Sequence, residues 1–200
     1  MTLESRVLGS IFALGALGRN ATPDLVARST GIGAKDVRSV MKSLQEKGRI
    51  SLNSGKASLT TRGRAEIKVV FIGGGFEVIH PGHLHTIEKA KGLGDVLVVA
   101  VARDSTIRKR KGREPVSDEA QRVKLLMALR AVDAAVLGVE GDIYDTLAKV
   151  RPDVVALGHD QYHEEKEIIQ EARKRGMRIK TVRIPSPIPS LKTTRILRVA

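Results

Sequence analysis

The chain contains no cysteine and no tryptophan, and aromatic residues make up only 2% of its 200 residues. The absence of cysteine excludes disulfide bonds, thiolate metal ligands and thiol nucleophiles. No apolar run approaches the roughly 20 residues that a membrane-spanning helix needs, and the N-terminus has no signal-peptide pattern. We therefore expect a cytoplasmic protein with no membrane partner.

Positive charge dominates the composition. Lys and Arg number 35 against 22 Asp and Glu, which gives a formal net charge of +13. Such a balance favours polyanionic partners, either nucleic acid or phosphorylated metabolites, without choosing between them. Residues 1–67 carry 11 basic and 5 acidic side chains, and residues 68–200 carry 24 and 17. Because both parts are basic, charge alone does not assign nucleic-acid binding to either.

Residues 1–66 combine helical periodicity with a hairpin signal. Apolar residues recur at helical spacing in Leu3–Leu17, and Thr22-Pro23 is typical of a capped helix start. Ala34–Lys47 has an apolar face and a basic face, and the following residues alternate around Asn53-Ser54-Gly55, which indicates a β-hairpin. Three helices and a hairpin resemble a small winged helix-turn-helix domain.

In that domain Ala34–Lys47 would be the recognition helix, with Lys35, Arg38 and Lys42 facing DNA. The alternative is a structural or dimerising module that has the fold without DNA binding, because fold alone does not determine function. The sequence leaves both interpretations open. We also expect the protein to form a homodimer.

The periodicity changes after Arg64. Short, β-branched-rich apolar runs now alternate with helical stretches, the runs being Val69–Ile72, Val96–Val101, Ala134–Leu137, Val154–Leu157 and Ile179–Ile184. This alternation predicts an α/β domain over residues 67–200, with a Rossmann-like, doubly wound parallel sheet of five strands. Ligands of such sheets bind beyond the carboxyl ends of the strands, where the winding direction reverses.

The first of these strands runs into a glycine-rich segment with two histidines, Gly73-Gly74-Gly75-Phe76-Glu77-Val78-Ile79-His80-Pro81-Gly82-His83. Glycines let the backbone approach phosphate, and two imidazoles at a helix N-terminus add donors beside a positive dipole end. The alternative is a pair of helix-capping histidines. A metal site that includes His85 is disfavoured, because residues two apart on a helix do not face each other. We expect no metal to be held by the protein alone.

This segment resembles the HxGH signature of the cytidylyltransferase-like nucleotidyltransferases. The resemblance implies that His80 and His83 are catalytic: both contact the nucleotide phosphates, and His83 stabilises the α-phosphoryl transition state. It also implies that Gly74, Gly75 and Phe76 bind the nucleotide. Gly75 stands where this family usually has Thr or Ser, and Glu77 stands where it usually has Asp.

Later segments narrow the resemblance to archaeal FAD synthases and glycerol-3-phosphate cytidylyltransferases. A basic loop over residues 108–113 precedes a Gly-Arg-x-Pro turn, and Gln121-Arg122 matches a later Gln-Arg pair. Cations of this loop could bind the leaving pyrophosphate, which concentrates negative charge. The resemblance implies a catalytic role for Lys111 and nucleotide binding by Arg113.

The resemblance extends to three further stretches, Ala102–Thr106, Leu157–Gln161 and Lys192–Ile196. The last of them matches only in part, because Lys192 replaces the usual first Ser. The resemblance implies that the acceptor is bound by Arg103, Asp104 and Gln161. It implies that the nucleotide is bound in addition by Gly158, Asp160, Thr193 and Thr194.

Together these matches imply a nucleotidyltransferase that transfers a nucleoside monophosphate from a nucleoside triphosphate to a phosphorylated acceptor and releases pyrophosphate. The preferred substrates are ATP and FMN, which give FAD, with Mg²⁺ as the divalent ion. One alternative is a CTP-dependent transfer to a polyol phosphate of the glycerol 3-phosphate type. An alternative of another class is a DNA-binding regulator whose Rossmann-like domain senses a nucleotide.

Overall fold

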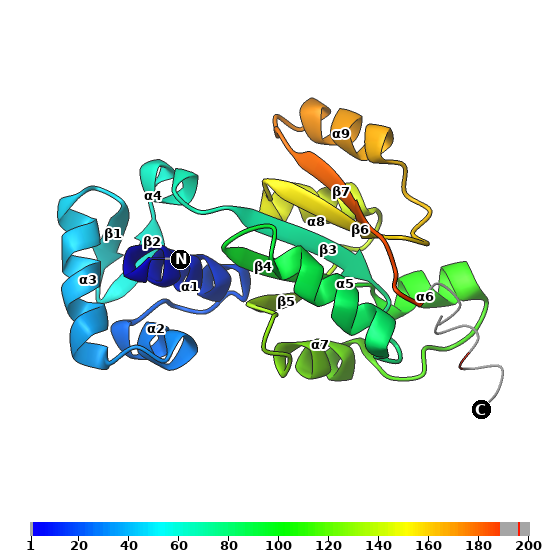
Figure 1. Cartoon of the computed structure of the whole chain (residues 1–200), viewed down its shortest axis with the longest axis horizontal. Coiled ribbons are helices and arrows are strands. Elements are labelled where there is room, and N and C mark those ends of the chain that lie inside the picture. The colour runs from blue at the N-terminus through cyan, green and yellow to red at the C-terminus, as the bar shows by residue number, and fades with distance from the viewer. Residues whose placement is uncertain (1, 189–195, 197–200) are drawn as a thin grey trace. The chain divides into compact units, whose positions relative to one another are not determined.

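The structure is a computed structural model that describes residues 2–188 and residue 196. The chain divides into two compact units, Met1–Lys68 and Val69–Ala200. Figure 1 labels the helices and strands of both units.

Helices and a short hairpin make up the first unit. Its elements are α1 (Leu3–Ala16), α2 (Pro23–Thr30), α3 (Ala34–Glu46), the antiparallel strands β1 (Ile50–Asn53) and β2 (Lys56–Leu59), and α4 (Thr61–Ala65). The Thr22 side chain caps α2 by accepting from Leu25 N, and Gly31 ends it in the left-handed conformation at φ 68°. The predicted helices and hairpin are present, whereas α4 gave no signal in the sequence. The winged helix-turn-helix assignment stays a prediction.

A five-stranded parallel sheet forms the centre of the second unit. Its strands are β3 (Val69–Gly74), β4 (Val96–Val101), β5 (Ala134–Leu137), β6 (Val154–Gly158) and β7 (Lys180–Ile184), in the order β5-β4-β3-β6-β7. The chain moves outward from β3 through β4 and β5, then returns to the other side of β3 with β6. This confirms the predicted Rossmann-like sheet, whose winding reverses between β3 and β6.

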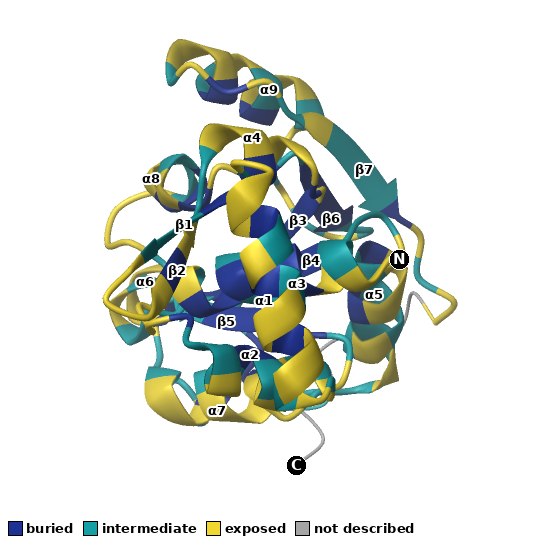
Figure 2. Ribbon diagram, turned by 90° about the vertical axis from the view of Figure 1, so that its left-hand side faces the viewer, coloured by how far each residue is buried: buried dark blue, intermediate teal, exposed yellow. Residues whose placement is uncertain are grey.

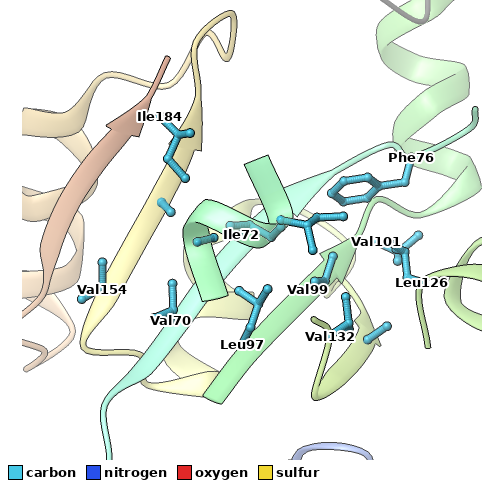
Figure 3. Close-up of a cluster of buried hydrophobic side chains, with 14 residues drawn as sticks. Val70, Ile72, Phe76, Leu97, Val99, Val101, Leu126, Val132, Val154 and Ile184 are labelled. Atoms are coloured by element: carbon cyan, nitrogen blue, oxygen red, sulfur yellow. The ribbon is translucent and has the colours of Figure 1, made fainter. Parts of the chain in front are cut away.

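The helices of this unit are α5 (Pro81–Lys91), α6 (Asp104–Lys111), α7 (Glu119–Met127), α8 (Ile143–Val150) and α9 (Glu165–Lys174). All six residues of β4 are buried, as in parallel sheets whose two faces are covered. In Figure 2 the central strands are coloured as buried, while α9 alternates between buried and exposed positions. Figure 3 shows Val70 and Ile72 of β3 beside Leu97 and Val99 of β4.

One predicted local structure is wrong. The basic stretch over residues 108–113 is not a loop, because α6 continues through Lys111 and ends at Gly112 with φ 64°. Lys and Arg are good helix formers, and Ile107 anchors this helix with only 3% exposure.

Gly63 of α4 provides a test of the packing in the first unit. A Cβ at Gly63 would lie 1.9 Å from the carbonyl oxygen of Arg49, which also accepts a hydrogen bond from Thr60 N. We therefore expect Gly63→Ala to lower the free energy of unfolding by about 2 kcal/mol or more. The control is Gly15→Ala, an exposed helical site with nothing within 4 Å, which should stabilise by roughly 1 kcal/mol. Denaturant-dependent hydrogen exchange of residues 1–68 measures both, and equal stabilities would contradict the packing.

Candidate active site

A cavity of about 410 Å³ opens beyond the carboxyl ends of β3, β4 and β6. Its lining includes Gly73–Phe76 from the first of these ends, Ala100–Arg103 from the second and Gly158–His163 from the third. The volume lies within the range of small-molecule sites, roughly 300–1,000 Å³. The cavity thus occupies the reversal point of the sheet, where the fold class places ligands.

The loop after β3 is shaped by the Phe76 ring. Phe76 adopts a positive φ of 50°, and its side chain is buried in the core cluster (Figure 3). A Cβ on Gly74 would lie 2.9 Å from Cε2 of this ring, so a larger residue does not fit at Gly74. Gly75 is different, because the nearest atoms to an added Cβ lie 3.9 Å away. The packing thus requires glycine at position 74 and leaves room for a side chain at position 75.

His80 and His83 lie next to each other at the start of α5. His80 is the N-cap residue in an extended conformation, Pro81 opens the helix, and the two imidazole centroids are 3.9 Å apart. Both side chains line the cavity. Among the described residues, neither buried Nδ1 atom has a hydrogen bond partner. An anionic ligand in the cavity would meet the positive end of α5 beside these imidazoles.

Both imidazoles are neutral near pH 7. Burial lowers the pKa of His83 to about 4, with the neighbouring His80 as a further cause. Burial also lowers the pKa of His80 from 6.5. A neutral imidazole has one N–H donor and one acceptor nitrogen. The pair therefore adds directional hydrogen bonding to the cavity without adding full positive charge.

Glu77 is a buried carboxylate that holds two cations. Its side chain is 0% exposed and accepts hydrogen bonds from Lys111 Nζ and, at 2.7 Å, from Arg113 Nη1. Burial by itself would raise the pKa of Glu77, but Arg113 and Lys111 outweigh burial and the pKa is lowered. Lys111 lines the cavity. Arg113 is not among the lining residues; it bonds Glu77 and the Glu114 carbonyl.

Arg122 connects the backbone segments around the cavity. Its side chain is 0% exposed, and Nη1 donates to the carbonyl oxygens of Gly75 (2.7 Å) and Ala102 (2.8 Å). Nε donates to the Ser117 carbonyl at 3.0 Å, and Nη2 pairs with Asp104. The guanidinium thus ties the ends of β3 and β4 to the start of α6. The Gln121-Arg122 pair in the sequence carried no indication of this role.

The two predicted acceptor-binding residues after β4 are placed differently. Arg103 lines the cavity, and its Nη2 lies 3.1 Å from Glu119 Oε1. The Asp104 side chain is not among the lining groups. Its carboxylate accepts from Arg122 and, at 3.4 Å, from Glu119 N, because it begins α6 beside the start of α7.

Gln161 connects the segment after β6 to β3. Its Nε2 donates to the Gly73 carbonyl at 2.6 Å, and its Oε1 accepts from Gly158 N at 3.3 Å. Arg183 of β7 holds the same segment by donating to the carbonyls of Gly158 and Gln161. The cavity lining here includes Gly158, Asp160 and Gln161, so the structure brings these predicted residues together with the histidine pair.

Arg110, Tyr162 and His163 are among the lining residues to which the sequence gave no individual role. The guanidinium of Arg110 lies 4.4 Å from the centroid of the Tyr162 ring, which contacts the His163 ring with centroids 4.0 Å apart. These side-chain contacts connect α6 with the segment after β6. Arg110 belongs to the recognised basic stretch, but nothing in its spacing pointed to a tyrosine 52 residues away. Thr193 and Thr194, expected to bind phosphate, lie outside the residues that the structure describes.

Within residues 2–188 and 196, no group of three or more His, Asp or Glu side chains could hold a metal ion. No helix in the same residues is long and apolar enough to cross a membrane.

The lowered pKa of His83 predicts a pH dependence of stability. The His83 side chain has a pKa of about 6.5 in the unfolded chain and about 4 in the folded chain, so it is protonated more easily when the chain is unfolded. The neutral side chain therefore contributes its full stabilisation to the folded state above pH 6.5. This stabilisation is lost as the pH falls toward 4, by up to about 3 kcal/mol. We expect His83→Gln to reduce this loss, measured as the difference between wild-type and variant unfolding free energies at several pH values. Parallel curves would contradict the pKa shift.

Comparison with known proteins agrees with this geometry. Residues 71–199 match the family model described as cytidylyltransferase-like. The FAD synthase of Methanothermus fervidus is 52% identical over 114 residues, which cover 56% of this chain and 78% of that protein. The FAD synthase of Archaeoglobus profundus is 46% identical over 111 residues, 56% of this chain and 70% of that protein.

A solved structure gives the same result for the fold. The lipopolysaccharide core biosynthesis protein from Thermoplasma volcanium GSS1 is 43% identical and has a TM-score of 0.58, over 60% of this chain and 98% of that one. The family model covers well over half of the chain and includes most of the second unit. The chain therefore belongs to the cytidylyltransferase-like family and is a nucleotidyltransferase.

Proposed function

We propose that this chain is an FAD synthase, which transfers AMP from ATP to FMN and releases pyrophosphate. The main support is the pair of adjacent imidazoles that line the cavity at the reversal point of the sheet, His80 and His83. Relatives named FAD synthases, which are 41–52% identical, support the choice of substrates.

In this reaction an oxygen of the FMN phosphate attacks the α-phosphorus of ATP in line, and the bond between that phosphorus and the bridging oxygen to the β-phosphorus breaks. The electron pair leaves with pyrophosphate. The attacking phosphate is already ionised, so no protein nucleophile is required. Catalysis then consists of positioning the reactants and stabilising the charge that develops. ATP would enter with a divalent ion on its phosphates, by default Mg²⁺, which needs few protein ligands.

The geometry supports distinct roles for the histidines and the cation from α6. Imidazole N–H groups of His80 and His83 would donate to the α-phosphoryl oxygens, beside the positive end of α5. Lys111, held at the cavity by Glu77, would interact with the leaving pyrophosphate. Arg113 would act through Glu77, since it bonds the same carboxylate.

Gly75 and Glu77 are two of the departures from the family pattern, and their positions in the structure suggest a common explanation. The nearest atoms to a Cβ at position 75 include Glu77 Oε2 and Lys111 Nζ, both at 3.9 Å. A Ser or Thr hydroxyl would extend into this space toward the carboxylate. We infer that glycine at position 75 leaves the Glu77–Lys111 pair undisturbed and open to phosphate.

The lining residues fall into two groups under this proposal. The nucleotide would be bound by the backbone of Gly74 and Gly75, by Phe76, Gly158 and Asp160, and the acceptor by Arg103 and Gln161. Asp104 would serve the acceptor side indirectly, through Arg122. Phosphate binding by Thr193 and Thr194, and the homodimer, stay predictions.

A substrate screen tests the choice of ATP and FMN. Purified protein with ATP, Mg²⁺ and FMN should release pyrophosphate and form FAD, measured by separating the flavins and assaying pyrophosphate. CTP with glycerol 3-phosphate is the comparison pair. Reaction of that pair alone would refute the flavin assignment while leaving the chain a nucleotidyltransferase.

A histidine substitution tests the proposed chemistry. His83→Ala should lower kcat by about a hundredfold or more and leave the Kd for ATP within a few fold, because the imidazole acts mainly on charge that develops in the transition state. The control is His85→Ala. His85 is the other histidine of α5 and is not among the cavity-lining residues, so this variant should keep kcat near the wild-type value. Near-normal turnover of the His83 variant would exclude the proposed role.

A further inference from the structure

One face of α3 in the first unit is basic and exposed. Lys35, Arg38 and Lys42 are all exposed, and their spacing of three and four residues places them side by side along the helix. The opposite face packs into the core of the unit through Val37, Met41 and Leu44. Packing therefore determines which way the three cations point.

These cations are largely uncompensated. Within the part of the chain that the structure describes, Lys35 and Lys42 form no ion pair. Arg38 Nη1 lies 3.2 Å from Asp24 Oδ1, but the two side chains are 59% and 73% exposed. Such surface pairs contribute little, about 0–1 kcal/mol. Residues 1–68 as a whole have 12 basic and 5 acidic side chains.

The hairpin of the same unit adds a polar, basic tip. β1 packs against α3, and the turn to β2 has positive φ at Ser54 and Gly55. The turn residues and Lys56 are exposed. The hairpin therefore ends in exposed residues that offer amide, hydroxyl and ammonium donors to solvent.

We propose that the first unit binds duplex DNA, with α3 in the major groove and the hairpin tip on the adjacent backbone. A helix with exposed side chains fits the width of that groove, about 12 Å, and the cations match phosphate charge. An anionic membrane fits less well, since Leu3 of α1 is the exposed large hydrophobic residue among residues 2–68 and α3 has none. The cations contact phosphates, so the binding tolerates many sequences. This function is independent of FAD synthesis.

The test uses the full-length chain and a labelled duplex of about 20 base pairs, titrated between about 50 and 200 mM salt. Wild-type affinity should fall with salt. The triple variant K35E/R38E/K42E should bind at least about tenfold more weakly at the lowest salt. The slope of log binding constant against log salt concentration should be smaller in magnitude by about 2–3 for this variant, since each phosphate contact contributes about 0.9.

The control K166E/R173E/R178E makes the same change of net charge at exposed residues of the second unit and should bind within about threefold of wild type. A gain-of-function variant, Asp24→Asn, removes the carboxylate beside Arg38 and should tighten binding a few fold. Retained hydrogen-exchange protection of α3 in the triple variant shows that its fold is intact.

Four results would overturn the proposal: no binding of the duplex by wild type, unchanged affinity in the α3 variant, equal losses in both triple variants, or tighter binding to phosphatidylserine vesicles or single-stranded RNA than to the duplex. Nucleotidyl transfer should be unchanged in the α3 variant, because none of its three residues lines the cavity.

Discussion

The geometry of the cavity depends on one buried guanidinium. Arg122 binds three backbone carbonyls and Asp104, and these partners come from the loop after β3, the end of β4 and the segments that begin α6 and α7. A buried charge is tolerated only when it is paired and its donors are satisfied. Loss of any partner would leave an uncompensated charge or a free donor. The interaction therefore positions the Gly75 loop relative to the end of β4.

A second constraint is the balance of charge inside the cavity. The chain is strongly basic, yet the groups closest to the proposed reaction are neutral or paired: two imidazoles with lowered pKa values and a lysine on a buried carboxylate. Unpaired cations packed this closely would repel one another in the absence of substrate. The arrangement leaves hydrogen-bond donors already oriented toward the place that phosphate would occupy, which reduces the reorganisation needed during the reaction.

The resemblance to known FAD synthases and the physical description of the site support each other at different levels. Identity between sequences supports the choice of substrates but does not say how a side chain acts. The structure explains several of the residue types at the site. The imidazoles have Nδ1 atoms without a hydrogen-bond partner among the described residues, position 74 requires glycine because of the Phe76 ring, and Glu77 pairs with Arg113. The first unit lies entirely outside the family match, so its function has to be argued from its own surface.

The sequence by itself determined the five strands, the class of sheet and the histidine loop. Each of these is encoded by adjacent residues: apolar runs, helix starts, and a motif of eleven positions directly after a strand. The tertiary structure alone decided that Asp104 faces Arg122, that Arg113 shares Glu77 with Lys111, and that Arg110 packs on Tyr162. These partners are 18 to 52 residues apart. Side-chain pairing over such separations depends on which strand ends the sheet brings together, and residue spacing along the chain does not contain that information.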